Sequence, residues 1–315
     1  MFRSLKTLPG RIFARPIMLV VVACLLAAPS TRGLTAQDRE KPKPPDAKKE
    51  DIKLPDEKEL EKNRKKQEAA GIKLSKVESI VEIAILAYGG RKQLETVRSS
   101  AEEQGTIRLA VDQGDVTGNF QLRTLRKEKT WDDLLRVDLD LTNPEALQRQ
   151  GAPKTVKYVI AFNGASVWSA QNGQYVTPRA EAEAAFRAQL THEYMALLRY
   201  KEDGSKIEFV APETISGIDT QVVDLVNTKG EKTRFWVSAK TYHVLHAEYE
   251  LQLAEGKTTK YKIHYYYSPY RVFQNTLLPT RRLMEQDGKF VQEVMINAAN
   301  YSAKLDPEIF QHLQE

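Results

Sequence analysis

The segment Gly204–Leu253 reads GSKIEFVAPETISGIDTQVVDLVNTKGEKTRFWVSAKTYHVLHAEYELQL. It contains four short runs rich in β-branched and aromatic residues, separated by Gly, Asn, Asp or Ser. The loop Asn227–Gly230 ends in glycine and suits a hairpin between the second and third runs. In the third run Thr233, Phe235 and Val237 fall on one face, and charged residues and a tryptophan fall on the other. One apolar and one mixed face is typical of an antiparallel sheet covered on one side.

Runs of the same kind precede and follow this segment. Asn163-Gly164, Asn172-Gly173 and Asp287-Gly288 predict tight turns, the first two being two-residue hairpin turns. Residues 270–278, between Pro269 and Pro279, are expected to form a loop. About a dozen short strands in one region of about 245 residues favour a large curved sheet or barrel. The further predicted strands are 106–111, 116–125, 131–141, 156–162, 165–170, 174–177, 258–267, 280–286 and 289–298.

Two segments have helical spacing instead. Ser75-Lys-Val-Glu78 fits a capping box, and the apolar helix that it opens ends at Gly89-Gly90. Residues 180–200 predict an amphipathic helix of about five turns, which must cover a sheet face or an opening. Residues 71–315 are therefore predicted to form one mainly β (α+β) domain, a large curved antiparallel sheet or half-barrel with two substantial helices on its concave face. The apolar positions of the second helix are Ala182, Phe186, Leu190, Tyr194, Leu197 and Leu198.

Residues 1–36 have the pattern of a secretory signal peptide: basic residues, an apolar run at 17–28, and small residues at Ala28, Ser30 and Ala36. The apolar run is shorter than the roughly 20 residues of an ordinary spanning helix. We therefore expect export to the periplasm, with an uncleaved membrane anchor as the alternative. The only cysteine, Cys24, loosely fits a lipobox, so a lipoprotein tethered through Cys24 is a second alternative.

The net charge of +5 comes from the leader, because residues 1–36 hold five basic residues and no acidic ones. The rest of the chain has 42 bases against 42 acids, so we expect no nucleic-acid partner. Residues 37–70 are rich in Pro, Lys and Glu and nearly lack apolar residues, which predicts a disordered tether. Without a cysteine after the leader, the domain has no disulfide or thiol nucleophile, and its stability must come from core burial.

No motif for enzymatic chemistry is present. His243 and His246 are three residues apart on a predicted strand and therefore point to opposite faces, and His192-Glu193 lacks the second histidine of a zinc-protease helix. We expect a non-enzymatic protein without a cofactor or a metal site. A site formed by Asp and Glu residues that only the fold brings together remains open. The aromatic residues that either pack the sheet or line a cleft are Tyr261, Tyr265, Tyr267, Trp168 and Trp236.

Four segments together resemble the LolA/LolB-like periplasmic lipoprotein-carrier superfamily, and especially the proteins called outer-membrane-lipoprotein-sorting-like. The resemblance implies an exported half-barrel of antiparallel strands whose concave face holds acyl chains under helices. Its motifs are turns, strand starts and one proline. The matching segments are Ile80–Val97 with Tyr88-Gly-Gly90, Tyr158–Gln174 with Trp168, Gly217–Val237, and Tyr270–Phe310 with Leu278-Pro279 and Leu305-Asp-Pro-Glu-Ile-Phe310.

The first functional hypothesis is a monomeric cell-envelope protein that binds a lipid or an acylated lipoprotein in an apolar cavity, for transport or sorting to the outer membrane. Its partners would be acyl chains and an inner or outer membrane surface. The candidate ligand-contacting residues are a stripe on the second helix, Phe186, Leu190, Tyr194 and Leu197, with Val77, Val81 and Ile85 of the first helix beneath it.

Two other hypotheses remain. The chain could be a non-enzymatic interaction module of the envelope with a filled core. It could also be an envelope hydrolase, which would need two facing carboxylates in a cleft.

Overall fold

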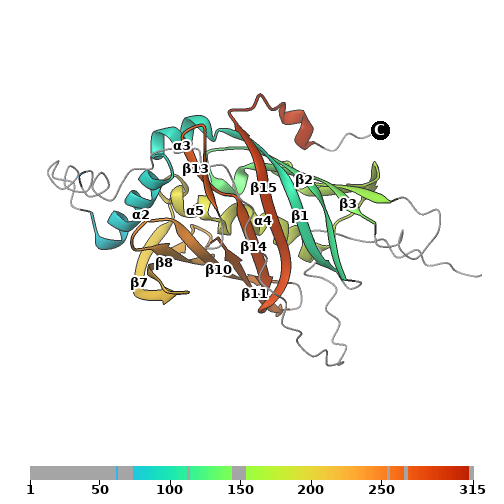
Figure 1. Cartoon of the computed structure of the whole chain (residues 1–315). Helices are drawn as coiled ribbons and strands as arrows, with labels where there is room; N and C mark the ends of the chain where they lie inside the picture. Colours follow the sequence, from blue (N-terminus) through green and yellow to red (C-terminus); the bar gives the residue numbers. More distant parts are fainter. Residues whose placement is uncertain are drawn as a thin grey trace, which may run out of the picture.

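The structure is a computed structural model that describes residues 62, 74–111, 114–143, 154–253, 256–265 and 269–311. Its main feature is a thirteen-stranded antiparallel sheet in the order β6-β5-β4-β3-β2-β1-β15-β14-β11-β10-β9-β8-β7 (Figure 1). A separate hairpin pairs β12 with β13. The strands are β1 Ser100–Val111, β2 Gly114–Leu125, β3 Leu134–Thr142, β4 Thr155–Phe162, β5 Val167–Gln171, β6 Gln174–Val176, β7 Lys206–Ile215, β8 Ile218–Val226, β9 Lys232–Ser238, β10 Val244–Gln252, β11 Thr258–His264, β12 Tyr270–Phe273, β13 Thr276–Pro279, β14 Arg281–Gln286 and β15 Lys289–Tyr301.

The segment Gly204–Leu253 forms the four consecutive strands β7 to β10, as its pattern predicts. On β9, Phe235 and Val237 are fully buried in the main core, and Lys232 at the start of the strand is exposed. On β10 the pairing with β9 shifts register between Val244 and His246, which is a β-bulge. Buried and exposed side chains therefore do not simply alternate along this strand. Val244 therefore joins the core together with Ala247 and Tyr249.

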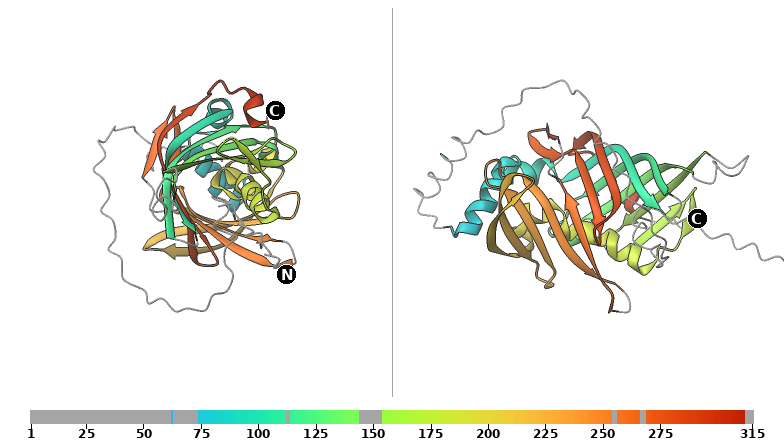
Figure 2. Two further views of the ribbon diagram at one scale, coloured as in Figure 1. Left: turned by 90° about the vertical axis from the view of Figure 1, so that its right-hand side faces the viewer. Right: turned by 60° about the horizontal axis from the view of Figure 1, so that its bottom comes forward.

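The sheet curves around a helical segment, which the left view of Figure 2 shows in yellow-green inside the arch. Two glycines permit this curvature at the central strands. A Cβ at Gly105 would lie 1.9 Å from the backbone O of Met295, and one at Gly118 would lie 2.2 Å from the backbone O of Asp140. A register shift follows Gln104 on β1 at the same place. Glycine lets the neighbouring backbones approach closely and bend. The predicted curved half-barrel with helices on its concave face is confirmed.

The first helix, α2 (Lys76–Ala87), begins where the sequence predicts it. Ser75 and Glu78 form the complete capping box. Gly89 has φ +119° and lies against the backbone of Asn275 and Thr276. A short helix that we did not predict, α3 (Arg91–Val97), follows directly and leads into β1. Both helices lie at one end of the half-barrel (Figure 1).

The predicted five-turn helix over 180–200 is wrong in its continuity. The structure has three helices there, α4 (Ala180–His192), α5 (Tyr194–Leu198) and α6 (Tyr200–Asp203). Glu193 interrupts the first two, with an extended backbone at φ −78° and ψ 166°. α4 lies between β10 and a short 3-10 turn, Thr130–Asp132, and α5 contacts α2. The apolar spacing continues through the interruption because both parts face the same core, so it could not reveal the break.

Two expected connections differ from the structure. Residues 270–278 do not form a loop, because β12 and β13 pair there around Gln274 and Asn275, which have φ +47° and +62°. The side chain of Gln274 bonds both backbone groups of Tyr301, which holds this glycine-free turn in place. Asn163-Gly164 belongs to the four-residue connection between β4 and β5, where the Asn163 side chain accepts two backbone N–H groups. Asn172-Gly173 and Asp287-Gly288 do form two-residue turns.

The C-terminal 3-10 turn, Pro307–Phe310, packs against β3 and β5. Trp168 Nε1 donates to the backbone O of Phe310 at 2.8 Å, and Arg136 Nη1 donates to that of Ile309 at 2.6 Å. Arg136 alternates with the buried Leu135 and Val137, so this turn covers the outer face of the sheet. Trp168 therefore serves packing on the outer face.

The predictions for residues 1–36, for Cys24 and for nearly all of the tether at 37–70 lie outside the described residues, as does the one for Tyr267. Within the part of the chain that the structure describes, no helix is long and apolar enough to cross a membrane. The division of the chain at residues 36 and 70 stays a prediction.

Candidate functional site

A partly open cavity of ≈ 150 Å³ lies between the concave face of the sheet and the α4–α5 segment, residues 180–198. Six strands of the sheet and two helices contribute to it. The lining residues are Arg98, Ala101, Glu103, Ile107, Phe120, Leu122, Thr124, Arg126, Thr130, Asp133, Leu135, Val137, Phe186, Gln189, Leu190, Glu193, Tyr194, Met195, Arg199, Ile263, Arg282, Met284, Gln292, Val294 and Tyr301.

The wall contributed by the strands is largely apolar. Alternation along β2 and β3 turns every second residue toward the helices, and these residues are mostly aliphatic or aromatic. Phe120, Leu135 and Val137 are buried, whereas Leu122 and Ala101 remain half-buried. Such a surface suits a hydrocarbon group, because transfer of apolar area out of water is favourable.

One end of the cavity carries an ion-pair cluster centred on Arg282 of β14. Its Nη1 donates to Oε2 of Glu193 at 2.7 Å, and its Nη2 donates to Oε2 of Glu103 at 3.2 Å. The hydroxyl of Tyr301 donates to the other oxygen of Glu103 at 3.3 Å. Burial raises the pKa of the Glu193 carboxyl above its ordinary value, and Arg282 opposes that shift. The interruption between α4 and α5 is therefore fixed to the sheet.

A second arginine, Arg98, lies beside this cluster and is only 8 % exposed. Its Nη1 donates to the hydroxyl of Tyr194 at 2.7 Å, its Nε to Thr276 Oγ1 at 3.2 Å, and its Nη2 to the backbone O of Leu277 at 2.8 Å. The guanidinium also lies 4.5 Å from the centre of the Tyr301 ring. Arg98 thus connects α5 to the β13 hairpin strand.

A further polar group lies where α5 ends. Nη1 of Arg199 donates to Oδ2 of Asp133 at 2.5 Å, and its Nε pairs with Glu202 at 3.0 Å. Arg126 pairs with the same Glu202 carboxylate and donates to the backbone O of Leu94. Burial raises the pKa of Asp133 to about 6, with Arg199 opposing the shift. These contacts fix the C-terminal end of the helical segment to the sheet and to α3.

The predicted ligand-contacting residues lie in two places. Phe186, Leu190 and Tyr194 line the cavity, as the stripe implies. Leu197 is fully buried in the main core, as are Val81 and Ile85, and Val77 is half-buried against it. The first helix contacts α5 and β7. That these seven residues bind a ligand stays a prediction.

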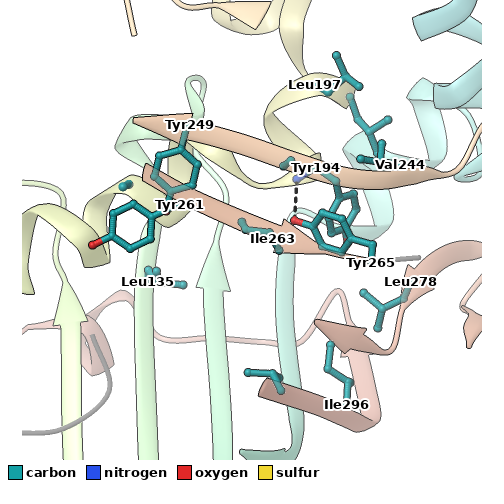
Figure 3. Close-up of a cluster of buried hydrophobic side chains, with 14 of the residues drawn as sticks. Leu135, Tyr194, Leu197, Val244, Tyr249, Tyr261, Ile263, Tyr265, Leu278 and Ile296 are labelled. Carbon is teal, nitrogen blue, oxygen red and sulfur yellow. Dashed lines mark hydrogen bonds between the residues drawn. The ribbon is translucent and has the colours of Figure 1, made fainter. Parts of the chain in front are cut away.

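Aromatic rings fill the core next to the cavity. Tyr249 stacks between His192 and Tyr261, at ring-centre distances of 4.1 Å and 5.1 Å. Figure 3 shows Tyr249 and Tyr261 side by side on neighbouring strands. It also shows the hydrogen bond in which the backbone N–H of Tyr194 donates to the hydroxyl of Tyr265, at 3.4 Å. Tyr261 and Tyr265 are thus packing residues of the sheet, the first of the two alternatives left open by the sequence.

Two of the described histidines lie close together on neighbouring strands. His246 and His264 face each other across β10 and β11 with ring centres 4.5 Å apart, a pairing that sequence spacing did not reveal. His264 Nε2 lies 3.3 Å from Glu285 Oε2. Among the described residues, no group of three His, Cys, Asp or Glu side chains could hold a metal ion.

A second hollow of ≈ 720 Å³ opens at the rim formed by β9, β10 and β11. Several of its charged side chains are paired, Lys232 and Arg234 with Asp224, and Lys260 with Glu248. This hollow has a more polar lining than the cavity beneath α4 and α5.

No protein-family model matches the chain, and no curated protein matches it. Its structure is similar to a DUF1329 family protein from Desulfovibrio piger (13 % identity, 76 % of this chain, 98 % of that one, TM-score 0.48). It is also similar to an outer membrane lipoprotein-sorting protein domain from Vibrio parahaemolyticus (14 % identity, 68 % of this chain, 90 % of that one, TM-score 0.46). A third similar structure is a LolA superfamily protein from Nitrosomonas europaea (18 % identity, 76 % of this chain, 99 % of that one, TM-score 0.46). These similarities assign no ligand or activity to this chain. The architecture that the resemblance implies, a curved antiparallel half-barrel with helices on its concave face, is the one that the structure has.

The cavity also brings two carboxylates together, as the hydrolase hypothesis requires. Glu103 and Glu193, however, both accept hydrogen bonds from Arg282, so the guanidinium occupies the position between them. A hydrolase of this kind needs the space between its two carboxylates for the substrate, and here the arginine fills that space. The arrangement is therefore better suited to binding and positioning than to proton transfer.

Proposed function

We propose that this chain is a non-enzymatic, exported envelope protein that binds the acyl chain of a lipid or of an acylated protein in the cavity beneath α4 and α5. The observation that carries the proposal is a cavity with an apolar strand wall under a separate helical cover. A filled core, which the interaction-module hypothesis expects, would leave no such space.

The size of the cavity sets a condition on binding. An apolar cavity of about 150 Å³ admits a molecule the size of benzene, whereas ligand pockets commonly measure about 300–1,000 Å³. A long acyl chain therefore fits only if the cavity widens from its volume of ≈ 150 Å³. The α4–α5 segment is the part suited to move, because the opposite wall is a continuous hydrogen-bonded sheet. It would act as a lid over the bound chain.

The energy of such binding is sufficient without covalent chemistry. Each CH₂ group removed from water contributes about 0.8 kcal/mol. Ten such groups give about 8 kcal/mol, which corresponds to a Kd of about 1 μM before the cost of moving the lid. Release would follow when the lid returns and the cavity narrows. Transport or sorting toward the outer membrane, from a location in the periplasm, is the process in which such reversible binding is useful.

A cavity-filling substitution tests this function. Phe186→Asp is unsuitable, because Phe186 is fully buried and a charge there would unfold the protein. Ala101 lines the cavity and is half-buried, so Ala101→Phe would occupy the space with little strain. The matched control is Ala110→Phe, on the same strand but on the outer face.

We expect Ala101→Phe to weaken binding of a fluorescent long-chain acyl probe at least tenfold, with both variants keeping the circular dichroism of the wild type. Equal binding by Ala101→Phe and Ala110→Phe would mean that the ligand does not bind in this cavity. Absence of acyl binding in the wild type would instead support the interaction module.

A further inference from the structure

The arginines of the cavity wall have hydrogen-bond donors that the protein does not satisfy well. Besides Tyr194, Nη1 of Arg98 reaches only the thioether sulfur of Met195, at 3.4 Å. Sulfur of this type is a weak acceptor. Nε of Arg282 is buried and has no hydrogen-bond partner in the described structure. A buried donor without a good acceptor raises the free energy of the folded protein, so a ligand oxygen that accepts a hydrogen bond from either nitrogen would bind favourably.

The charge of Arg98 is likewise unmatched by direct contact. Its strong acceptors are neutral, and Arg98 forms no ion pair with a carboxylate of the described residues. The carboxylate of Glu103 is separated from it by Tyr301, whose ring lies under the guanidinium and whose hydroxyl donates to Glu103. Buried charges in proteins are normally paired. This cation lines a cavity and has room for a partner there.

The position of Arg98 relative to the apolar wall fits one end of an acyl ligand. Ala101 pairs across the strands with Tyr301, whose ring lies under Arg98, and further along the same strand Ile107 pairs with Val294. All of these residues line the cavity. Met195 is half-buried, unbranched and flexible, so it can turn aside and leave Nη1 to a ligand oxygen. A planar guanidinium binds carboxylate and phosphate oxygens in a two-pronged geometry.

We propose that Arg98, with Arg282 beside it, forms a subsite for an anionic end group, a carboxylate or a phosphate, on an acyl ligand whose hydrocarbon chain follows the apolar wall. This inference rests on the proposed function and names its ligand class: acidic single-chain lipids are preferred over neutral acyl compounds.

The first test compares ligands of equal chain length on the full wild-type chain. Palmitate, hexadecyl phosphate and hexadecanol each displace a neutral fluorescent probe, below their micellar concentrations. We expect the better of the two anions to bind at least tenfold more tightly than hexadecanol, and which anion it is identifies carboxylate or phosphate as the end group. Equal affinity of all three would overturn the anion subsite and leave acyl binding intact. No displacement by any of them would overturn the proposed function itself.

The second test removes the charge. Arg98→Gln should lose the preference for the anion and keep the affinity for hexadecanol, while Arg98→Lys should retain part of the preference. Arg108→Gln is the matched control, because Arg108 pairs with Asp115 and Glu293 outside the cavity. An unchanged preference in Arg98→Gln would overturn the proposal. If Arg98→Gln does not fold, the wild-type ligand comparison decides the question alone.

Discussion

Nη1 of Arg282 on β14 lies 2.7 Å from Oε2 of Glu193, the residue that separates α4 from α5. The break in the helical cover is therefore also its point of attachment to the sheet. Together with the contacts of α5 through Arg98–Tyr194 and Arg199–Asp133, this ion pair holds the cover closed, so the cover can move for a ligand only when such contacts break.

Glu193→Gln should accelerate ligand release. The substitution removes the charge that Arg282 holds at this point, and a charge-assisted hydrogen bond is worth about 1.5–3 kcal/mol. We expect the off-rate of a bound acyl probe to rise about tenfold, which corresponds to about 1.4 kcal/mol. Stopped-flow dilution measures it. Glu293→Gln is the control, because Glu293 pairs with Arg108 and Arg281 outside the cavity. Equal off-rates in both variants would contradict the role of Glu193.

Acid should destabilise the protein through His192. This residue at the end of α4 is 2 % exposed, and burial lowers the pKa of its imidazole from 6.5 to about 4. The unfolded chain therefore binds the proton first, and the stability linked to His192 is lost as the pH falls from about 6.5 to about 4. Between pH 7.5 and pH 4.5 the free energy of unfolding of the His192→Gln variant should fall by about 2–3 kcal/mol less than that of the wild type.

Urea unfolding at the two pH values measures this difference. His243 and His246 also have lowered pKa values, of about 4 and about 3, because burial disfavours their charged forms. They contribute in the same direction, so only the change between wild type and variant is assigned to His192. A variant that loses as much stability on acidification as the wild type does would exclude a linked role for this histidine.

Gly105→Ala should destabilise the half-barrel. The new Cβ would lie 1.9 Å from the backbone O of Met295, so β1 and β15 must separate at the bulge. Overpacking of this kind costs about 1–3 kcal/mol, and a backbone contact leaves little room for relaxation. Gly114→Ala, where a Cβ meets no atom within 4 Å, is a control for the loss of glycine on a neighbouring strand, although its φ of +113° adds strain of its own. A smaller loss of urea stability in Gly105→Ala than in Gly114→Ala would contradict this account of the curvature.

The parts of the fold that depend on local chemistry were predictable from the sequence. Ser75 and Glu78 are three residues apart, and the capping box they form needs no other part of the chain. The alternation in Gly204–Leu253 likewise predicted four strands, and on β9 it predicted the buried face of Thr233, Phe235 and Val237. The bulge on β10 was not predicted. The break at Glu193 was not predictable, because the apolar spacing is the same on both sides and the attachment to Arg282 comes from a residue 89 positions away.

The polar residues of the site were not predictable from the sequence for the same reason. Arg98 contacts Tyr194, Thr276 and Leu277, which lie 96, 178 and 179 positions away along the chain. No local pattern distinguishes such an arginine from one on a solvated surface. Phe186 and Leu190 could be placed on one face because they are four residues apart on α4. Tyr194 lies beyond the break, on α5, and lines the same cavity.

The most direct test of acyl binding is native mass spectrometry of the protein purified from its own envelope without detergent. The account predicts a bound mass of one acidic acyl lipid per chain, which is lost from the Ala101→Phe variant and retained by Ala110→Phe. A wild-type spectrum that contains only the unliganded chain, from protein that also fails to take up palmitate or hexadecyl phosphate, would contradict it.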